Sequence, residues 1–350
     1  MAQSEPEPQD IPWVEKYRPT ASNASCSESA LVGHQEMQHL FNNMIQQNNA
    51  LNLLIYGPPG TGKTSQVIMM CQRMYLDKYE YARHVLEINA SYDRGIDVVR
   101  GKIKQFCKRA VASGDGDGGS SSQGRRALLK FVVLDEADTL SIEAQNALRR
   151  CIEMYAYNTR FCFVCNYVTN IIAPILSRCF VWHYKQLEIP VVVERLRGIV
   201  RREGLCQEGD GGEDDQETVL RLIANECSGD LRRCITTLQS VHMITPGTLS
   251  ERKVNEYLNL PPIEMVEEMR AAVTPAQMYD LANRIYYRGY AIHDLIRRTI
   301  EWIIENLSDQ IPTLARVHIA LARLEYKATL AIDERLLLLE MVQIVSTTRL

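Results

Sequence analysis

Short hydrophobic runs and longer amphipathic stretches alternate along the first half of the chain. The runs are four to eight residues long, typical of buried parallel strands, and the stretches between them favour helices. The predicted strands are 51–56, 84–89, 128–134, 159–166 and 179–184. The predicted helices are 63–76, 95–111 and 141–155. This alternation predicts an α/β fold with a parallel sheet and helices on both of its faces.

The strand pattern ends near residue 188, and the rest of the chain is predicted to be helical. Three helices are expected near residues 190–203, 216–228 and 230–243, followed by a hinge at Thr245-Pro246-Gly247. Beyond the hinge, one apolar stripe has helical spacing: Ile292, Ile296, Ile300, Ile303 and Leu307. The last segment, around Leu336 to Val342, is apolar on most of its circumference. This pattern predicts burial on more than one side, as in a helix packed between subunits.

These shifts in pattern divide the chain into four parts. Residues 1–10 are acidic and rich in proline, which predicts a disordered N-terminus. The α/β domain is expected to span residues 11–186, with a flexible Gly/Ser-rich insertion at 113–126. A small helical domain at 187–246 contains a second polar insertion at 207–217, and a larger helical domain follows at 247–350.

Composition is that of a globular protein with two or three domains: 350 residues, 46% of them hydrophobic. No apolar run approaches the ~20 residues of a membrane span, and no signal peptide opens the chain. The ten cysteines have irregular spacing, which favours free thiols. Cys162 and Cys165 lie in an apolar strand, and core packing is favoured over metal or redox chemistry.

The net charge of −4 conceals two local clusters. Residues 208–217 contain six acids and no base, whereas residues 94–109 contain six bases and one acid, a local charge of +5. A basic stripe on a helix can follow a phosphate backbone. A solvated helix face is the alternative, and charge alone favours it.

Residues 57–64 are GPPGTGKT, which fits the phosphate-binding pattern G-x-x-x-x-G-K-[ST]. The motif lies between a predicted strand and a predicted helix, so backbone N–H groups and the helix N-terminus can bind phosphate. Lys63 is expected to reach the β- and γ-phosphates, and Thr64 to hold Mg²⁺ through its hydroxyl. The loop residues expected to bind ATP are Gly57, Pro58, Pro59, Gly60, Thr61, Gly62, Lys63, Thr64 and Ser65.

A second motif, LDEAD at residues 134–138, follows another buried strand. Open α/β sheets bind ligands at the C-terminal ends of their strands. Asp135 is expected to hold Mg²⁺ from the outer shell, and Glu136 to orient and deprotonate a water that attacks the γ-phosphate. A simple pair of strand-end charges would not require the phosphate-binding loop upstream. The two motifs together predict a site that binds ATP with Mg²⁺ and hydrolyses it.

Further motifs occur in a fixed order along the chain. They are PWVEKYRP at 12–19, LEINASYDRGIDVVR at 86–100, CNY at 165–167, LSRC at 176–179 and GDLRR at 229–233. With GPPGTGKT and LDEAD, this order resembles the small subunits of replication factor C, the eukaryotic sliding-clamp loader of the AAA+ class. The segments FCFVCNYVT and GDLRRCITTLQS are most similar to the branch numbered 2 in budding yeast and 4 in human. The resemblance covers about residues 11–245, and beyond them it rests on length and helical character.

The resemblance implies an AAA+ ATPase domain, a helical lid domain and a helical collar. It also assigns the pocket for the adenine base to the PWVEKYRP box and a nearby segment. The residues concerned are Val14, Tyr17, Arg18, Pro19, Val32 and Gly33.

Three further roles come from the resemblance. Asn166 matches sensor 1, an amide that binds the γ-phosphate or the attacking water; without the family match it would be a strand-end turn residue. Arg178 matches the arginine finger, which acts in trans on the ATP of a neighbouring subunit; a structural ion pair is the alternative. Arg232 matches sensor 2, which contacts the nucleotide from the lid, although Arg233 is an equally basic neighbour.

The resemblance also implies partners. Arg94 and Arg100 match positions that face the DNA backbone, where contacts to phosphate carry no sequence information. The implied partners are the other replication factor C subunits in a heteropentamer, the PCNA clamp and primer–template DNA, with no membrane. The implied location is the nucleus.

Three functions remain open on the sequence. The first is an active ATPase that opens PCNA and loads it onto primer–template DNA in replication and repair. The second is a mainly structural subunit with slow turnover at its own site, which donates its arginine finger to a neighbour. The third is a different AAA+ machine, which the PWVEKYRP box, the LSRC motif and the helical tail disfavour.

Overall fold

The chain forms two compact units, Met1–Leu249 and Ser250–Leu350. The computed structural model describes residues 11–19, 35–47, 50–75, 77–92, 97, 99–109, 129–205, 213–244, 250–306, 311–330 and 333–347. No helix within these ranges is both long and apolar enough to cross a membrane.

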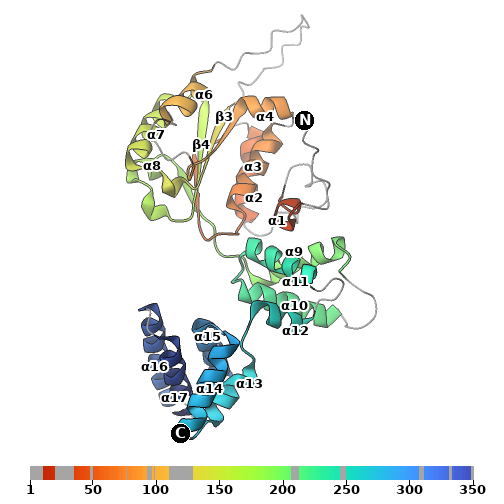
Figure 1. Cartoon of the computed structure of the whole chain (residues 1–350). Coiled ribbons are helices and arrows are strands. Elements are labelled where there is room, and N and C mark those ends of the chain that lie inside the picture. Colours follow the sequence, from red (N-terminus) through yellow and green to blue (C-terminus); the bar gives the residue numbers. More distant parts are fainter. Residues whose placement is uncertain are drawn as a thin grey trace, which may run out of the picture. The chain divides into compact units, whose positions relative to one another are not determined.

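A five-stranded parallel sheet forms the centre of the first unit (Figure 1). Its strands are β1 (Leu53–Tyr56), β2 (Val85–Asn89), β3 (Lys130–Asp135), β4 (Thr159–Cys165) and β5 (Phe180–His183). They lie in the order β2-β3-β4-β1-β5, so the P-loop strand β1 is flanked by β4 and β5. The predicted α/β fold with a parallel sheet is confirmed.

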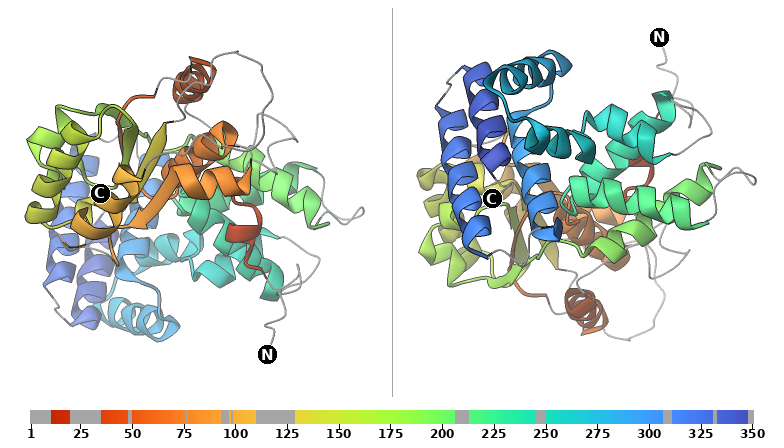
Figure 2. Two further views of the ribbon diagram at one scale, coloured as in Figure 1. Left: turned by 90° about the horizontal axis from the view of Figure 1, so that it is seen from above. Right: turned by 90° about the horizontal axis from the view of Figure 1, so that it is seen from below.

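Helices cover both faces of this sheet, as Figure 1 shows and Figure 2 repeats from two further directions. They are α2 (Gln35–Gln47), α3 (Lys63–Met74), α4 (Lys78–His84), η2 (Val99–Ile103), α6 (Lys104–Lys108), α7 (Ile142–Met154) and α8 (Ala173–Leu176). Short turns of 3-10 helix follow β3 and β4, at Ala137–Thr139 (η3) and Val168–Asn170 (η4). The helices α2, α4 and α8 were not predicted.

Alternate side chains of the strands build two separate cores, because successive residues of a strand point to opposite faces. Leu54, Val132 and Phe163 pack with α6 and α7, whereas the neighbouring Leu53 and Val133 pack with α2 and α3. Cys162 belongs to the second core and Cys165 to the first. The two thiols therefore point away from each other, and the prediction of core packing is confirmed.

The basic segment is less regular than the predicted helix over 95–111. Within the described residues 99–109 it consists of the π-helix η2 followed by the short α-helix α6. Lys130, which is 2% exposed, stabilises the end of α6, because its Nζ donates to the carbonyl oxygens of Phe106 (2.9 Å) and Arg109. Arg94 lies outside the described residues, and Arg100 lies in η2.

Three helices follow the sheet in the first unit: α9 (Ile189–Arg202), α10 (Glu213–Glu226) and α11 (Leu231–Ile244). We call them the lid. α10 begins earlier than predicted and includes the last five residues of the expected polar insertion 207–217. Acidic residues stabilise the N-terminus of a helix, and Glu217 also pairs with Arg221 at 2.7 Å.

The short helix α1 (Trp13–Lys16) packs against the lid although it comes first in the chain. The Trp13 backbone N–H donates to Gln239 Oε1 of α11 at 3.0 Å, and the Trp13 ring stacks on His242. The Tyr17 hydroxyl donates to Glu203 Oε1 at 2.5 Å, just beyond α9. The PWVEKYRP box is thus anchored on the lid.

The second unit is a helical bundle. It contains α12 (Glu251–Leu258), α13 (Ile263–Ala271), α14 (Pro275–Arg288), α15 (Ile292–Asn306), α16 (Ile311–Thr329) and α17 (Glu334–Ser346). α17 contacts α13, α14, α15 and α16, which explains why its sequence is apolar on several sides. Leu337, Leu338 and Met341 are buried by these helices, whereas Leu336 is 59% exposed.

Replacing Leu148 by Ala is expected to lower the free energy of unfolding by about 2–5 kcal/mol, because Leu148 is fully buried between α7 and the sheet. Urea denaturation followed by circular dichroism measures the change. Ile142→Ala is the matched control on the same helix, since Ile142 is 65% exposed. It should change stability by about 0.5 kcal/mol or less. Equal effects of the two substitutions would contradict the assignment of Leu148 to the core.

Candidate nucleotide-binding site

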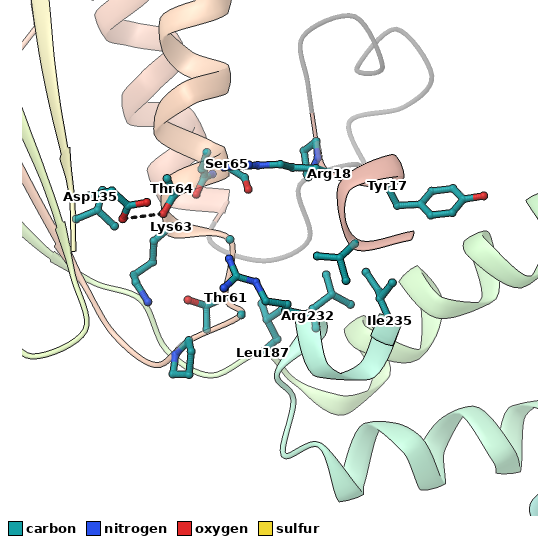
Figure 3. Close-up of a pocket in the computed structure, with 18 of the residues that line it drawn as sticks. Tyr17, Arg18, Thr61, Lys63, Thr64, Ser65, Asp135, Leu187, Arg232 and Ile235 are labelled. Atoms are coloured by element: carbon teal, nitrogen blue, oxygen red, sulfur yellow. Dashed lines mark hydrogen bonds between the residues drawn. The ribbon is translucent and has the colours of Figure 1, made fainter. Parts of the chain in front are cut away.

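A pocket lies at the C-terminal edge of the sheet, between the P-loop, the PWVEKYRP box and the lid (Figure 3). Its lining residues come from seven separate stretches of the sequence. They are Val14, Glu15, Tyr17, Arg18, Pro19, Pro59, Gly60, Thr61, Gly62, Lys63, Thr64, Ser65, Gln66, Asp135, Glu136, Val164, Cys165, Asn166, Leu187, Arg195, Leu231, Arg232 and Ile235. Most of the residues predicted to bind ATP are therefore brought together.

Lys63 lies at the start of α3 and is 7% exposed. Its Nζ donates to the carbonyl oxygens of Gly57 and Pro58, each at 2.7 Å, and to Asn166 Oδ1 at 3.0 Å. Burial lowers the pKa of Lys63. A phosphate group beside Nζ would supply the negative charge that these neutral acceptors lack.

The P-loop backbone is in close contact with other segments at two glycines. A Cβ atom at Gly57 would lie 2.1 Å from the carbonyl oxygen of Tyr184, and one at Gly60 would lie 1.8 Å from Asp230 Oδ1. Gly60 also has a φ of +72°, which favours glycine. The same Asp230 oxygen accepts the backbone N–H of Arg232 at the start of α11. The loop is thus packed directly against the N-terminus of a lid helix.

Thr64 and Asp135 lie beside each other at the expected metal position. The Thr64 hydroxyl donates to Asp135 Oδ1 at 3.1 Å, and the Glu136 backbone N–H donates to the same oxygen at 3.0 Å. Burial raises the pKa of Asp135. A hydroxyl and a carboxylate are the hard oxygen ligands that Mg²⁺ prefers, and a divalent cation would offset the burial of the carboxylate. These residues fit Mg²⁺.

Glu136 has a left-handed backbone conformation, with φ of 52° and ψ of 40°. A residue other than glycine in this region stores about 1–3 kcal/mol of strain, and such strain often occurs at functional sites. The conformation turns the chain sharply at the end of β3 and leaves the Glu136 side chain on the pocket wall. This placement suits a group that orients a water molecule.

Asn166 is placed by a neighbour from the LDEAD motif. Asp138 Oδ2 accepts the backbone N–H groups of Asn166 (3.3 Å) and Tyr167 (3.2 Å), which fixes the chain just beyond β4. The Asn166 side chain accepts a hydrogen bond from Lys63 Nζ within the pocket. Lys63 and Asn166, the two residues predicted to contact the γ-phosphate, therefore lie side by side in the pocket.

The lid contributes Arg232, and Figure 3 shows its side chain extending toward the P-loop. Arg233 is not among the lining residues, so the geometry favours Arg232 as the sensor. Leu231 and Ile235 lie on the same wall, one helical turn apart. This spacing in the sequence could have identified them as a pair on one face of α11.

Two other lining residues were missed for a physical reason. Leu187 lies in the link between β5 and α9, and Arg195 lies on α9, where its Nη2 donates to the carbonyl oxygen of Tyr17 at 3.0 Å. Neither residue belongs to a motif. Only the folding of the lid onto the PWVEKYRP box brings them to the pocket.

The PWVEKYRP box lines the pocket with Val14, Tyr17, Arg18 and Pro19. In Figure 3 Arg18 extends toward Ser65, whereas the ring of Tyr17 points away from the P-loop. Burial and the bond to Glu203 raise the pKa of Tyr17. The Tyr17 side chain therefore attaches the PWVEKYRP box to the lid, whereas Arg18 extends toward the P-loop. Val32 and Gly33 lie outside the described residues.

Three predicted residues do not line the pocket. Gly57 and Pro58 contact Lys63 Nζ only through their carbonyl oxygens. Arg178 lies after α8, where its Nη2 is 2.6 Å from Glu153 Oε1 of α7 and its Nη1 donates to the carbonyl oxygen of Pro174 at 2.8 Å. Its side chain is 33% exposed.

Asp135→Asn is expected to stabilise the nucleotide-free protein by about 1 kcal/mol at neutral pH, because it removes a charge that burial disfavours. Since the pKa of Asp135 is raised, protonation favours the folded state, and the gain should shrink as the pH falls through that pKa. Thermal unfolding across a pH series measures this. Asp138→Asn is the contrast, since the Asp138 carboxylate accepts two backbone N–H groups and its loss should give no gain. A less stable Asp135→Asn variant at neutral pH would contradict the expectation.

Known proteins resemble this chain in both sequence and fold. Residues 53–187 match the family described as ATPase family associated with various cellular activities (AAA). Replication factor C subunit 4 of Arabidopsis thaliana is 36% identical over 85% of this chain and 83% of the relative. Replication factor C subunit 5 of Homo sapiens is 33% identical over 97% of this chain and 93% of the relative, and human subunit 4 is 34% identical over 86% and 78%.

These relatives carry different subunit numbers at similar identities, so the assignment to one branch stays a prediction. Among solved structures, a single-residue mutant of RuvB from Thermotoga maritima is 12% identical, with a TM-score of 0.51 over 77% of this chain and 85% of that chain. That likeness supports the fold alone. The matches in sequence, together with the site above, identify this chain as an AAA ATPase that belongs to the replication factor C subunits.

Proposed function

We propose that this chain is an ATP-hydrolysing subunit of the sliding-clamp loader, which opens PCNA and loads it onto primer–template DNA in the nucleus. One observation carries the proposal. The groups predicted to bind ATP and prime it for hydrolysis line one pocket, whereas Arg178 lies outside that pocket and is 33% exposed. Among the described residues, the predicted arginine finger is the catalytic group that does not line the pocket, and a neighbouring subunit can supply its counterpart.

The chain's own residues suggest how the site works. Lys63 and the P-loop N–H groups hold the phosphates, and Arg232 approaches the same region from the lid. Glu136 orients and deprotonates the attacking water, and Asn166 helps to place it. Thr64, with Asp135 from the outer shell, would hold Mg²⁺, which would supply positive charge to the phosphate oxygens. Phosphoryl transfer depends mainly on such positioning and electrostatic stabilisation.

Arg178 is proposed to complete the site of the next subunit. An arginine finger supplied in trans stabilises charge on the transferring phosphoryl group. This arrangement makes hydrolysis depend on assembly, because neither subunit holds the whole set of groups.

DNA is proposed to bind through the basic segment that contains Arg94 and Arg100. In its described part, Lys104 and Lys108 are exposed on α6. Contacts of these bases to phosphate would hold DNA of any sequence.

The runner-up function is a structural subunit whose own site turns over slowly. The convergence of Lys63, Thr64, Asp135 and Glu136 disfavours it, because a site without turnover does not need a strained acid beside the metal position.

Glu136→Gln should retain ATP binding but slow hydrolysis at this chain's own site by about 100-fold or more, because a general base is lost. ATP turnover of the assembled complex, with and without PCNA and primed DNA, measures the effect, and a fluorescent ATP analogue reports binding. Turnover of the unaltered complex should rise when PCNA and DNA are added. Vigorous turnover by the isolated chain, indifferent to PCNA, would refute the clamp-loader proposal.

Arg178→Ala should leave ATP binding by this chain unchanged and lower turnover at the adjacent site by about 1000-fold, the effect of losing an arginine finger. Single-turnover hydrolysis in the assembled complex measures the loss. Arg233→Ala is the control, since Arg233 is another exposed arginine of this chain that lines no described pocket. Loss of ATP binding by the isolated Arg178→Ala chain would show that the arginine acts in cis.

A further inference from the structure

Arg178 is held in one orientation at both its main chain and its side chain. Its backbone N–H donates to Ile175 O at 3.0 Å, and its carbonyl oxygen accepts from Asn52 Nδ2 at 3.3 Å. Asn52 also accepts the Phe161 N–H of β4 at 3.0 Å. The base of the side chain is therefore fixed to the sheet.

The guanidinium of Arg178 has three further contacts. Nη1 donates to Pro174 O at 2.8 Å and to Ser177 Oγ at 3.2 Å, and Nη2 lies 2.6 Å from Glu153 Oε1. The first two acceptors belong to the same short segment as Arg178. Glu153 alone comes from another element, α7, and it alone is charged.

These contacts leave the guanidinium able to bind an acceptor outside the chain. A guanidinium has five N–H groups, and the contacts to described residues occupy three. The side chain is also 33% exposed. The Arg178 guanidinium is thus held by contacts within the chain, and the described residues leave it N–H groups free to bind a partner.

Glu153 is itself held in place. It lies in the last turn of α7, and Arg149 Nε approaches its Oε1 at 3.5 Å from one helical turn earlier. α7 packs on the sheet through buried residues such as Leu148 and Ile152. The carboxylate is therefore an anchor on a rigid element.

We propose that Glu153 is a positioning residue for the arginine finger: its carboxylate holds the Arg178 guanidinium extended at the surface, ready for the neighbouring subunit's ATP. This inference rests on the proposed function of Arg178. Because Glu153 already restrains the Arg178 side chain, less conformational entropy is lost when Arg178 binds at the adjacent site. A long, solvated arginine without this anchor would occupy the active orientation for a smaller fraction of the time.

The test uses the assembled complex with Glu153→Ala or Glu153→Gln in this chain. Steady-state ATP turnover in the presence of PCNA and primed DNA gives kcat and KM. We expect Glu153→Ala to lower the Arg178-dependent part of kcat about fivefold, as for a half-exposed ion pair. Glu153→Gln should lower it only about twofold, because its oxygen still accepts a hydrogen bond. KM for ATP should stay unchanged, because Glu153 is not among the residues that line the nucleotide pocket.

Two controls separate positioning from a general effect on structure. Glu143→Ala removes an equal charge from an exposed position on the same helix and should leave kcat unchanged. Glu153→Ala added to Arg178→Ala should cause no further loss, because a residue that acts only through Arg178 has no effect once Arg178 is gone.

The outcomes distinguish the two claims. If Arg178→Ala leaves turnover of the complex unchanged, the assignment of Arg178 as the arginine finger is wrong. If Arg178→Ala lowers turnover but Glu153→Ala does not, or if the two losses add in the double variant, the role of Glu153 is overturned and that of Arg178 stands.

Discussion

The close packing of the P-loop backbone is the constraint on which the rest of the first unit depends. At Gly57 the loop touches the main chain of Tyr184, just beyond β5, and at Gly60 it touches Asp230, at the start of α11. The Tyr184 hydroxyl also donates to Gln66 Oε1 on α3. The loop is therefore fixed between the sheet, its own helix and the lid, and a small shift in any of them changes its shape.

At the site beside this loop, the protein alone does not offset the cost of its buried charges. Lys63 and Asp135 both carry charges that burial disfavours, and Glu136 adds backbone strain. Binding energy from a nucleotide and its metal can offset these costs, and sites of this kind are commonly less stable than the scaffold around them. The core of the sheet, with its two layers of buried aliphatic and aromatic side chains, provides the stability that tolerates them.

The sequence motifs predicted the phosphate and metal side of the pocket, and the resemblance added four residues of the PWVEKYRP box, but other lining residues were missed. Lys63, Thr64, Asp135 and Glu136 could be predicted because strand, loop and helix follow one another locally, and local order fixes where these side chains lie. Leu187 and Arg195 could not, since their position depends on how the lid folds onto distant segments. The same holds for Glu153, which resembles an ordinary surface acid until the fold brings it to Arg178. The helix α2 was missed because its polar residues, many of them Asn and Gln, hide the buried face formed by Met37, Phe41 and Met44.

The attachment of α1 to the lid has a consequence for movement. Trp13 contacts Gln239 and His242, and Tyr17 contacts Glu203 and Arg195, so the first described segment of the chain is attached to the lid. Val14 and Arg18 on one wall and Arg232 on another then travel together. A rotation of the lid away from the sheet would move Val14, Arg18 and Arg232 away from the P-loop in a single step. In the proposed mechanism, one movement of the lid would therefore both open the pocket for nucleotide exchange and withdraw Arg232.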